Sequence, residues 1–338
     1  MKRTVMEMIR AIVVGLVMPI SMVALVLALT PTRAEGQQNL PTQVETILPT
    51  HGEEILIEPT ETVTDPIMID VIVDGQSREM KLEDYVLAVV LGEMPADFAY
   101  EALKAQAVVA RTYTLKTVSE GKRHAAGAVC DVSSCCQAYC DPADFLQQGG
   151  STEQLEKVRS AVEDTAGSVL FYDGKLITAT YFSCSGGTTE DALEVWGYDV
   201  PYLQSVSSPG EEDSAAYARK ITLSAAEFQS RMAIRLQGNP AGWFGKVTYT
   251  RGGGVATIEI GGVTYRGTTI RKLLNLRSTL FTIAVDGDSI IITTKGYGHR
   301  VGMSQYGADA MAASGSSFEE ILAYYYVGTQ LESWSESE

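Results

Sequence analysis

The sequence predicts an α+β fold in which antiparallel β-hairpins pack with helices. Two observations lead to this prediction. Short β-rich runs meet at an Asp-Gly pair at three places, and Asp-Gly between apolar runs is a strong hairpin signal. Helical segments separate these runs, but strands and helices do not alternate strictly as they do in a parallel sheet, so a Rossmann arrangement is not expected.

The expected elements follow one another along the chain. The hairpins are IMIDVIVDGQSREMKL, SVLFYDGKLITATYF and FTIAVDGDSIIITT, which span 67–82, 168–182 and 281–294. Helices are expected at 82–91, 97–118, 151–165, 222–233, 267–276, 302–314 and 317–326. Gly252, Gly253 and Gly254 are expected to form a loop between strands, because no helix follows them as a phosphate-binding loop requires.

The N-terminal segment is expected to anchor the chain in a membrane. Lys2, Arg3 and Arg10 precede an uncharged apolar stretch, and about 20 such residues span a bilayer. Basic residues before the stretch place the N-terminus in the cytoplasm. The alternative is a cleaved signal peptide with its site near Ala34. The expected organisation is a cytoplasmic stub (1–10), a transmembrane anchor (11–30), an acidic disordered linker (31–66) and an extracytoplasmic domain (67–335).

Composition excludes one large class of partners. The chain has 338 residues, 45% of them hydrophobic, which is enough for a substantial core. Its formal net charge of -16 and its isoelectric point near 4.7 argue against nucleic acid as a ligand, because binding phosphates requires a basic face. Length predicts one large domain or two small ones.

One carboxylate stands out in the segment LGEMPADFAYEALKAQAVVARTY. Glu93 lies between Gly92 and the pair Met94-Pro95, ahead of an alanine-rich helix. Proline prefers the first turn of a helix, so Glu93 is expected near a helix N-terminus, where the helix dipole favours the ionised carboxylate. On this stretch alone, a structural cap is the favoured interpretation. A general acid would require burial beside apolar groups to raise its pKa.

A histidine and four cysteines fall within the segment HAAGAVCDVSSCCQAYC (124–140). Clustered cysteines outside the cytoplasm usually form disulfides, and that interpretation stays open. The adjacent Cys135 and Cys136 do not pair easily with each other, and one histidine with three cysteines suits a closed, structural, tetrahedral zinc site, which is favoured. The preferred ligands are His124, Cys130, Cys135 and Cys136, with Cys140 as the substitute.

Two further segments carry candidate chemistry. In KGYGHRVGMSQYGADAMA, from Lys295, closely spaced glycines surround His299, which indicates that the backbone approaches something closely. His299 is a candidate to hold a substrate, to act as a base or to bridge to Glu93. In YFSCSGG, from Tyr181, Cys184 lies beside two glycines as a nucleophile on a tight turn would, with His299 as its base. A polar strand end is the alternative for Cys184.

Five segments, in this order, resemble the stage II sporulation protein D family of membrane-anchored lytic transglycosylases. They are EMPADFAYEALKAQAVVARTYTL, YFSCSGGTTEDALEVWG, PYLQSV, GYGHRVGMSQYGADAMA and YYYVGTQL, and the resemblance covers about residues 67–332. It implies cleavage of the MurNAc–GlcNAc bond of peptidoglycan, which leaves a 1,6-anhydro-muramoyl end, and it makes 67–335 the catalytic domain. The catalytic acid of the EMPA motif is here Glu93. One carboxylate suffices because the sugar's own C6 hydroxyl is the nucleophile, whereas a hydrolase normally needs two.

The resemblance also implies roles for other residues. Glycan binding or support of Glu93 is assigned to matching motif positions, which are Gln106, Arg111, Tyr181, Ser183, Ser185, His299, Ser304, Gln305 and Tyr306. A zinc site in some clostridial relatives corresponds to His124, Cys130, Cys135 and Cys136, with Cys135 in place of a second histidine. The family often has serine or threonine at Cys184, glycine at Arg300 and proline at Val327. The first of these differences weakens the cysteine-nucleophile interpretation.

The biological setting follows from the resemblance as well. It implies a single-pass protein of the mother-cell membrane that faces the forespore and acts during engulfment in sporulation. The implied partners are glycan strands stripped of stem peptides, the sporulation amidase/endopeptidase and a multi-pass membrane protein. The first alternative function is a non-catalytic, glycan-binding enhancer of a cell-wall amidase. The second is a zinc- or cysteine-dependent hydrolase.

Overall fold

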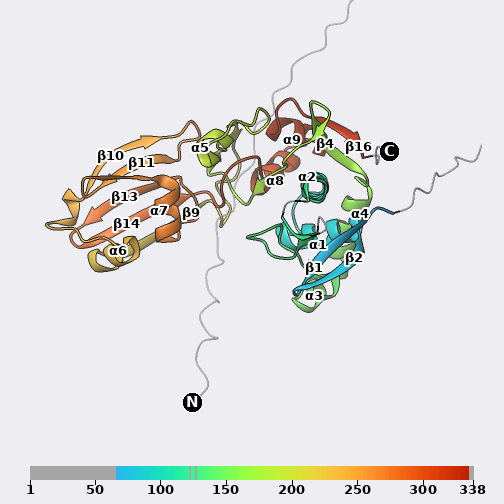
Figure 1. The fold of residues 1–338 in the computed structure, drawn as a ribbon, viewed down its shortest axis with the longest axis horizontal. Helices are drawn as coiled ribbons and strands as arrows, with labels where there is room; N and C mark the ends of the chain where they lie inside the picture. The colour runs from blue at the N-terminus through green and yellow to red at the C-terminus, as the bar shows by residue number, and fades with distance from the viewer. Residues whose placement is uncertain (1–65, 122, 126–127, 335–338) are drawn as a thin grey trace, which may run out of the picture. The chain divides into compact units, whose positions relative to one another are not determined.

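The structure is a computed structural model that describes residues 66–121, 123–125 and 128–334. These residues form mostly antiparallel sheets packed with helices (Figure 1), so the predicted α+β class is confirmed for them.

The predicted membrane anchor cannot be compared with this part of the chain. The stub (1–10), the anchor (11–30) and all but the last residue of the linker (31–66) lie outside the described residues. Within the described part, no helix is both long enough and apolar enough to cross a membrane.

All three predicted hairpins are present. They pair β1 (Met68–Val73) with β2 (Gln76–Lys81), β4 (Ser168–Tyr172) with β5 (Lys175–Leu176), and β13 (Phe281–Asp286) with β14 (Ser289–Lys295). Asp74 and Gly75 have φ of 51° and 75°, the left-handed geometry that a two-residue hairpin turn requires. The second hairpin is shorter than predicted, because β6 (Tyr181–Phe182) pairs in parallel with β15 (Met303–Ser304) instead.

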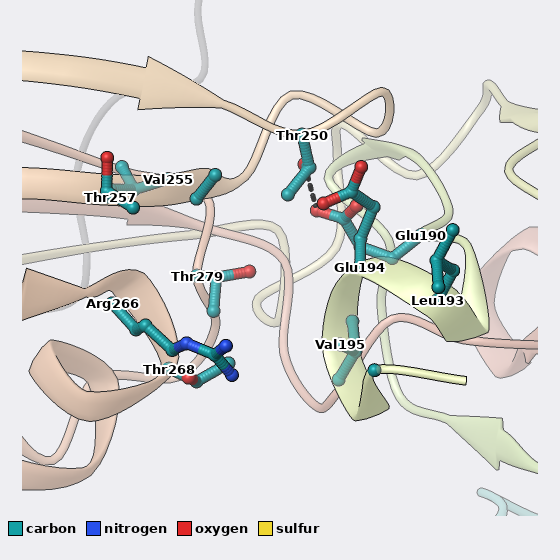
Figure 2. A pocket seen from close by; sticks show the side chains of 12 residues that line it. Glu190, Leu193, Glu194, Val195, Thr250, Val255, Thr257, Arg266, Thr268 and Thr279 are labelled. Atoms are coloured by element: carbon teal, nitrogen blue, oxygen red, sulfur yellow. Dashed lines mark hydrogen bonds between the residues drawn. The ribbon is translucent and has the colours of Figure 1, made fainter. Parts of the chain in front are cut away.

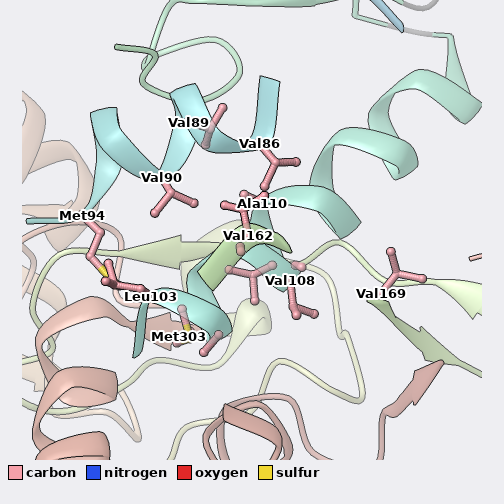
Figure 3. Packing of buried hydrophobic residues seen from close by; sticks show 14 of the residues in the cluster. Val86, Val89, Val90, Met94, Leu103, Val108, Ala110, Val162, Val169 and Met303 are labelled. Atoms are coloured by element: carbon pink, nitrogen blue, oxygen red, sulfur yellow. The ribbon is translucent and has the colours of Figure 1, made fainter. Parts of the chain in front are cut away.

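Five of the predicted helices contribute to the larger apolar core. They are α1 (Leu82–Glu93), α2 (Tyr100–Glu120), α4 (Thr152–Glu163), α8 (Gln305–Ala313) and α9 (Phe318–Tyr325). Ala102, Ala105 and Ala107 of α2 are fully buried, and such small side chains let neighbouring elements pack closely against the helix. Figure 3 shows valines of α1 beside Leu103 and Val108 of α2 in this core.

A second apolar core lies in the C-terminal half. Its sheets have the strand orders β13–β14–β9 (Ala218–Ser224) and β10 (Phe244–Tyr249)–β11 (Val255–Ile260)–β12 (Val263–Arg266). Helices α6 (Ala225–Met232) and α7 (Gly267–Leu274) supply Phe228 and Ile270 to it. The helix predicted at 222–233 begins later than expected because residues 218–224 form a strand. The expected loop between strands at 252–254 is present, because it joins β10 to β11. The third strand, β12, was not expected, since its turn from β11 is Gly261-Gly262 rather than Asp-Gly.

The remaining elements are short. They are β3 (Val129–Cys130), α3 (Pro142–Gln147), β7 (Gly187–Thr188), α5 (Ala192–Trp196), β8 (Ser207–Ser208), the 3-10 helix η2 (Pro240–Gly242) and β16 (Gln330–Ser333). β3 extends the β1–β2 hairpin, β16 extends the β4–β5 hairpin, and β7 pairs with β8. Elements this short carry too little periodicity to be predicted from a pattern of apolar residues.

The end of α1 corrects one expectation about Glu93. Glu93 is the last residue of α1, and Met94 is extended, with φ of -126° and ψ of 136°. A residue before proline avoids the helical region because the proline ring clashes with it, so Pro95 ends this helix. The predicted position of Glu93 near a helix N-terminus is therefore wrong, since α2 begins only at Tyr100.

Arg111 of α2 is a predicted glycan-binding residue, but the structure buries it completely. Its Nε and Nη2 donate to the two carboxylate oxygens of Glu83 at 2.8 and 2.6 Å. Nη1 and Nη2 also donate to the carbonyl oxygens of Ser168 and Val162. The guanidinium thus joins α1, α2, α4 and β4, and it has no exposed surface for a ligand.

We expect Arg111→Gln to destabilise the fold strongly. The substitution leaves two carbonyls and the Glu83 carboxylate, whose side chain is 38% exposed, without their donor, and leaving such carbonyls unsatisfied costs about 1–3 kcal/mol of unfolding free energy. The control is Lys116→Gln, which breaks an exposed pair with Glu120 on the same helix and should cost at most about 0.5 kcal/mol. Urea unfolding measures both, and equal losses would show that the contacts of Arg111 contribute no more than a surface ion pair.

Candidate active site and metal centre

A cavity of about 640 Å³ lies at the C-terminal end of α1. Five of the predicted catalytic and glycan-binding residues line it, and they are Glu93, Tyr181, Ser183, His299 and Gln305. The predicted metal ligand Cys136 lines it as well. The five residues come from three distant parts of the chain. The parallel pairing of β6 with β15 brings two of these parts together, and Gln137 and Ala138, which bond to Tyr181 and Glu93, connect them to the end of α1. The volume lies within the range of roughly 300 to 1,000 Å³ that is typical of ligand-binding sites.

Several aromatic and polar residues that line the cavity were missed by sequence reasoning. Among them are Tyr113, Gln137, Phe182 and Tyr297. Phe182 and Tyr297 lie close to predicted site residues in the same sequence motifs, so their position in the sequence could have predicted that they line the cavity. Tyr113 lies on α2, and Gln137 lies in residues 124–140, which we call the cysteine loop. Only tertiary packing places these two residues at the cavity, and no local sequence pattern distinguishes them.

The Glu93 carboxyl group is half-buried and holds one strong hydrogen bond. Its Oε1 accepts from the backbone N–H of Ala138 at 2.6 Å. Burial raises the pKa of this carboxyl group above its usual value, and hydrogen bonding to Ala138 and to the Tyr181 hydroxyl offsets part of that rise. Because Glu93 ends α1, the partial negative charge of the helix C-terminus also disfavours the carboxylate. The dipole of α1 therefore raises the pKa of Glu93, whereas the predicted position at a helix N-terminus would have lowered it.

The close approach of the cysteine loop to α1 requires a glycine. A Cβ at Gly92 would lie 2.8 Å from the backbone nitrogen of Tyr139, so no larger residue fits here without displacing the loop. Two other bonds hold the same segment, one from the N–H of Cys140 to the carbonyl of Ala88 and one from Gln137 Nε2 to Thr114 Oγ1. The Ala138 N–H is thereby directed at Glu93.

Tyr181 is held in position by this loop. Its hydroxyl oxygen lies 3.0 Å from Gln137 Oε1, and its single proton is donated to Gln137 or, when Glu93 ionises, to the Glu93 carboxylate. The amide group of Gln137 is itself fixed on α2. Burial raises the pKa of Tyr181 well above its usual value, so the phenol stays protonated and can donate. Tyr181, which was predicted to bind glycan or support Glu93, thus interacts with Glu93 and keeps its phenolic proton.

His299 lines the cavity as a neutral imidazole. Its ring centroid lies 5.6 Å from that of Phe182 and 5.5 Å from that of Trp196. Burial, with a smaller effect of the Arg271 charge, lowers the pKa of His299 to about 4. Nδ1 accepts from the N–H of Val301 at 3.1 Å, so the proton is on Nε2. Within the described part of the chain no hydrogen bond joins His299 to Glu93, and the expected bridge between them is not formed.

The glycines around His299 do allow a close backbone approach, as predicted. A Cβ at Gly296 would lie 2.7 Å from the carbonyl oxygen of Ser185, and one at Gly298 would lie 2.6 Å from Cβ of Phe182. The neighbour is therefore the protein's own segment around β6, not a ligand. This contact places His299 and Ser183 on the same cavity.

Ser185 and Ser304, both predicted to bind glycan, are fully buried around a carboxylate that sequence reasoning missed. Glu211 Oε2 accepts from the N–H and hydroxyl of Ser185 at 2.7 and 2.9 Å. Its Oε1 accepts from the hydroxyls of Ser304 and Ser208 at 2.7 and 2.6 Å. The two serines thus lie outside the cavity and hold the motif segments together. Glu211 stands in a loop rich in serine, glycine and acidic residues, where no pattern distinguishes it.

Gln106 and Tyr306 also lie behind the cavity wall. Gln106 is fully buried, and its Oε1 accepts from Gln305 Nε2 at 3.3 Å. Tyr306 places its ring edge-on to Phe98, with centroids 4.9 Å apart. Both residues support Gln305 or its helix, and neither lines the cavity.

Cys184 is not placed as a nucleophile. It is fully buried, and its thiol donates to Glu211 Oε2 at 3.0 Å. Burial and the adjacent Glu211 raise the pKa of Cys184 to about 12, so the reactive thiolate is disfavoured at neutral pH. The interpretation of Cys184 as a nucleophile with His299 as its base is therefore contradicted.

The predicted ligands His124, Cys130, Cys135 and Cys136 come together in a cluster that could hold a metal ion. Their ligand atoms all lie within 4.8 Å of one another. His124 Nε2 is 3.4 Å from Cys135 Sγ and 3.6 Å from Cys136 Sγ. Tetrahedral zinc with ordinary bond lengths separates nitrogen and sulfur ligands by about 3.6 Å, so these residues fit the ion. All five cysteines have free thiols, and Cys140 lies outside the cluster.

A second cavity, of about 230 Å³, lies between α5 and residues of β11 and α7 (Figure 2). None of the predicted site residues lines it. Its Glu190 is fully buried and accepts from Thr250 Oγ1 at 2.9 Å and from Arg300 Nη1 at 3.0 Å. Arg300 Nη2 also donates to the carbonyl of Gly252, so this pair fastens the glycine turn at 252–254. Arg300 has φ of 69°, a conformation that favours glycine.

Comparison with known proteins gives a consistent result. The family model described as stage II sporulation protein matches residues 75–172. Stage II sporulation protein D of Bacillus subtilis (strain 168) is 43% identical over 263 residues, which cover 76% of each chain. Stage II sporulation protein D of Bacillus amyloliquefaciens is 40% identical over 259 residues, which cover 75% of each chain.

The chain is also similar to a protein with a different name. The amidase enhancer of Bacillus subtilis (strain 168) is 30% identical over 303 residues, which cover 73% of this chain and 40% of that protein. The identity is higher and the coverage more even with the two sporulation proteins. The predicted resemblance is confirmed, and this chain belongs to the stage II sporulation protein D family.

Proposed function

We propose that this protein is a lytic transglycosylase that cleaves the MurNAc–GlcNAc bond of peptidoglycan and leaves a 1,6-anhydro-muramoyl end. One observation carries the proposal: Glu93 is the single carboxylate among the described residues that line the 640 Å³ cavity, and its pKa is raised. A hydrolase normally needs a second carboxylate to activate water or to attack. A cavity with a single carboxyl group suits a reaction in which the sugar supplies the nucleophile.

The mechanism uses Glu93 first as an acid and then as a base. Its proton passes to the glycosidic oxygen as the bond to muramoyl C1 breaks. The C6 hydroxyl of the same sugar attacks C1, and its proton returns to the Glu93 carboxylate, so no water is consumed. Because nucleophile and electrophile belong to one molecule, holding the sugar in the right conformation provides much of the rate enhancement.

The other cavity residues are proposed to hold the glycan. The Tyr181 phenol, the Nε2–H of His299 and the Gln305 amide can all donate to sugar oxygens, and Ser183 can donate or accept. We assign no glycan contact to Gln106, Arg111, Ser185, Ser304 or Tyr306, which are placed behind the cavity wall. These five residues support the elements that carry the others.

The proposed setting is the cell membrane during engulfment. The family supports a role in sporulation. We propose a single-pass membrane protein with its catalytic domain (67–335) outside the cytoplasm, acting with a sporulation amidase and a multi-pass membrane protein on glycan stripped of peptides. We further propose that His124, Cys130, Cys135 and Cys136 hold a structural zinc ion, which would stabilise the loop that carries Ala138.

A second candidate function is a non-catalytic enhancer of a cell-wall amidase. The similarity to the amidase enhancer of Bacillus subtilis favours it. Such a protein would bind glycan in the same cavity without any need for a proton donor there. The role of Glu93 therefore separates the two candidates.

Glu93→Gln should abolish the formation of anhydro-muramoyl products while glycan binding remains. Glutamine can still accept from the Ala138 N–H but cannot donate and recover a proton. The measurement is mass analysis of products from amidase-treated peptidoglycan. Glu194→Gln, in the second cavity, is the control and should retain activity. Full activity of Glu93→Gln would rule out the mechanism, and a folded native protein that binds but never cleaves would favour the enhancer.

Activity should fall as pH rises through the raised pKa of Glu93, because only the protonated form can act as the acid. Tyr181→Phe removes a hydrogen bond that lowers this pKa, so the fall in activity should move to higher pH. Tyr249→Phe, at an exposed surface site, should leave the profile unchanged. A shift to lower pH in Tyr181→Phe would contradict the assigned interaction.

Stability provides an independent readout of the same group. A carboxyl group whose pKa is raised by folding contributes stability below its unfolded pKa, and this is lost as pH rises through the folded pKa. The unfolding free energy of the native protein relative to Glu93→Gln should therefore decline over that pH range. A difference that grows with pH would show that folding lowers the pKa of Glu93.

The purified protein should contain about one zinc ion per chain, because three thiolates and an imidazole form a closed tetrahedral set. Chelation or Cys135→Ser should lower both the zinc content and the melting temperature, since binding to the folded state is linked to stability. Cys140→Ser is the matched control and should change neither. A zinc-free protein with an unchanged melting temperature would exclude the ion.

A further inference from the structure

Three arginines line a third cavity, of about 450 Å³, next to the second apolar core. Arg219 comes from β9, Arg231 from the last turn of α6, and Arg277 from the segment after α7. Among the residues that the structure describes, no carboxylate lies within 4.0 Å of these guanidinium groups. Three arginines without a close carboxylate around one cavity, in a chain with net charge -16, create a local site that attracts anions.

Local structure uses only part of this charge. Arg231 complements the dipole of α6, and the nearby Glu227 carboxylate is hydrogen-bonded to Ser224 and feels the charge of Arg231 without forming an ion pair with it. Arg277 Nη1 donates to the carbonyl of Ala215 at 3.0 Å. For Arg219, no hydrogen bond of the guanidinium is found within the described residues. The charge at the cavity therefore remains available to a ligand.

Arg277 connects this cavity with the one around Glu93. Its Cζ lies 5.1 Å from the ring centroid of Tyr297, and its carbonyl oxygen accepts from the N–H of Gly298 at 3.0 Å. Tyr297 and Gly298 both line the cavity of Glu93, and the Tyr297 side chain is 48% exposed. A strand that leaves the Glu93 cavity past Tyr297 thus reaches an arginine of the third cavity.

We propose that Arg219, Arg231 and Arg277 form an anion subsite for the free lactyl carboxylate of a muramoyl residue further along the glycan strand. The inference rests on the proposed function and extends its binding site. Every muramoyl residue carries a lactyl ether at O3. Its carboxyl group is a neutral amide while the stem peptide is attached, and it becomes a carboxylate when an amidase removes the peptide.

The subsite explains how a strand without peptides would be distinguished from one with peptides. Arginine binds carboxylates in a planar, bidentate manner, which an amide cannot reproduce. Thr222, Asn275 and Thr294 add polar groups to the cavity, and Leu274 and Leu276 add apolar surface for the sugar or lactyl methyl group. An amide-hydrolysing reaction must therefore supply this substrate before the glycan is bound tightly.

The test compares two glycans and two sets of variants. The full chain carrying Glu93→Gln, which prevents turnover, is titrated with peptide-free glycan and with the same glycan after its carboxylates are converted to methylamides. Arg219→Gln with Arg231→Gln should weaken binding of the free glycan roughly tenfold or more, the value expected for losing charge-assisted hydrogen bonds. Within the described part of the chain these two guanidinium groups make no hydrogen bond or ion pair, so folding should be unaffected, which circular dichroism checks. Arg235→Gln, an exposed arginine of the same region, is the control and should bind as the parent does.

The outcomes separate this inference from the proposed function. The parent protein should bind the methylamide glycan as weakly as the double variant binds the free glycan. The double variant should bind the methylamide glycan only slightly more weakly than it binds the free glycan. Equal binding of both glycans would overturn the subsite. The subsite would also be overturned if inorganic phosphate competed at the arginines although the methylamide glycan bound as tightly as the free glycan. If native protein makes no anhydro products while carboxylate-dependent binding persists, the subsite stands and the transglycosylase falls.

Discussion

The packing of residues 136–140 against the end of α1 is the contact on which the cavity depends. Gly92 leaves room for this segment, the Cys140 N–H bonds to Ala88, and the Ala138 N–H bonds to Glu93. Because the segment begins at a ligand of the cysteine–histidine cluster, one contact connects that cluster with the carboxyl group. Loosening it would expose Glu93 to water and return its pKa towards the ordinary value, since burial is the largest cause of the rise.

Buried carboxylates hold the rest of the cavity wall in place. Glu211 gathers hydroxyl and N–H donors from Ser185, Ser208 and Ser304, and Glu190 pairs with Arg300. Their partners lie on the segments that carry cavity residues, because Ser185 closely follows β6 and Arg300 belongs to the glycine-rich segment before α8. A buried charge is costly unless it is paired or fully hydrogen-bonded, so these contacts require their partners to stay where they are. Polar motif residues can therefore be essential to a site without touching its ligand.

The charge of the chain is distributed unevenly around the proposed substrate path. An acidic protein would repel an anionic glycan at long range, but among the described residues that line the cavity of Glu93 there is a single carboxyl group, whose raised pKa favours its neutral form. The adjoining cavity presents three arginines. Screening limits the repulsion between the remaining acids and the glycan to about 8 Å at physiological salt, so the local groups determine what binds.

The sequence alone determined the elements with strong local signals and the identity of the candidate acid. Asp-Gly pairs predicted the three hairpins because left-handed turn geometry needs such residues, and the cysteine–histidine spacing predicted a cluster that the fold does assemble. Tertiary structure decided which motif residues face the cavity. Burial is a property of the packed molecule, so Arg111, Ser185 and Ser304 look like ligand contacts in sequence and are bonded to Glu83 and Glu211 in the fold. The raised pKa of Glu93 and the meeting of three distant arginines have the same origin, because neither follows from neighbours along the chain.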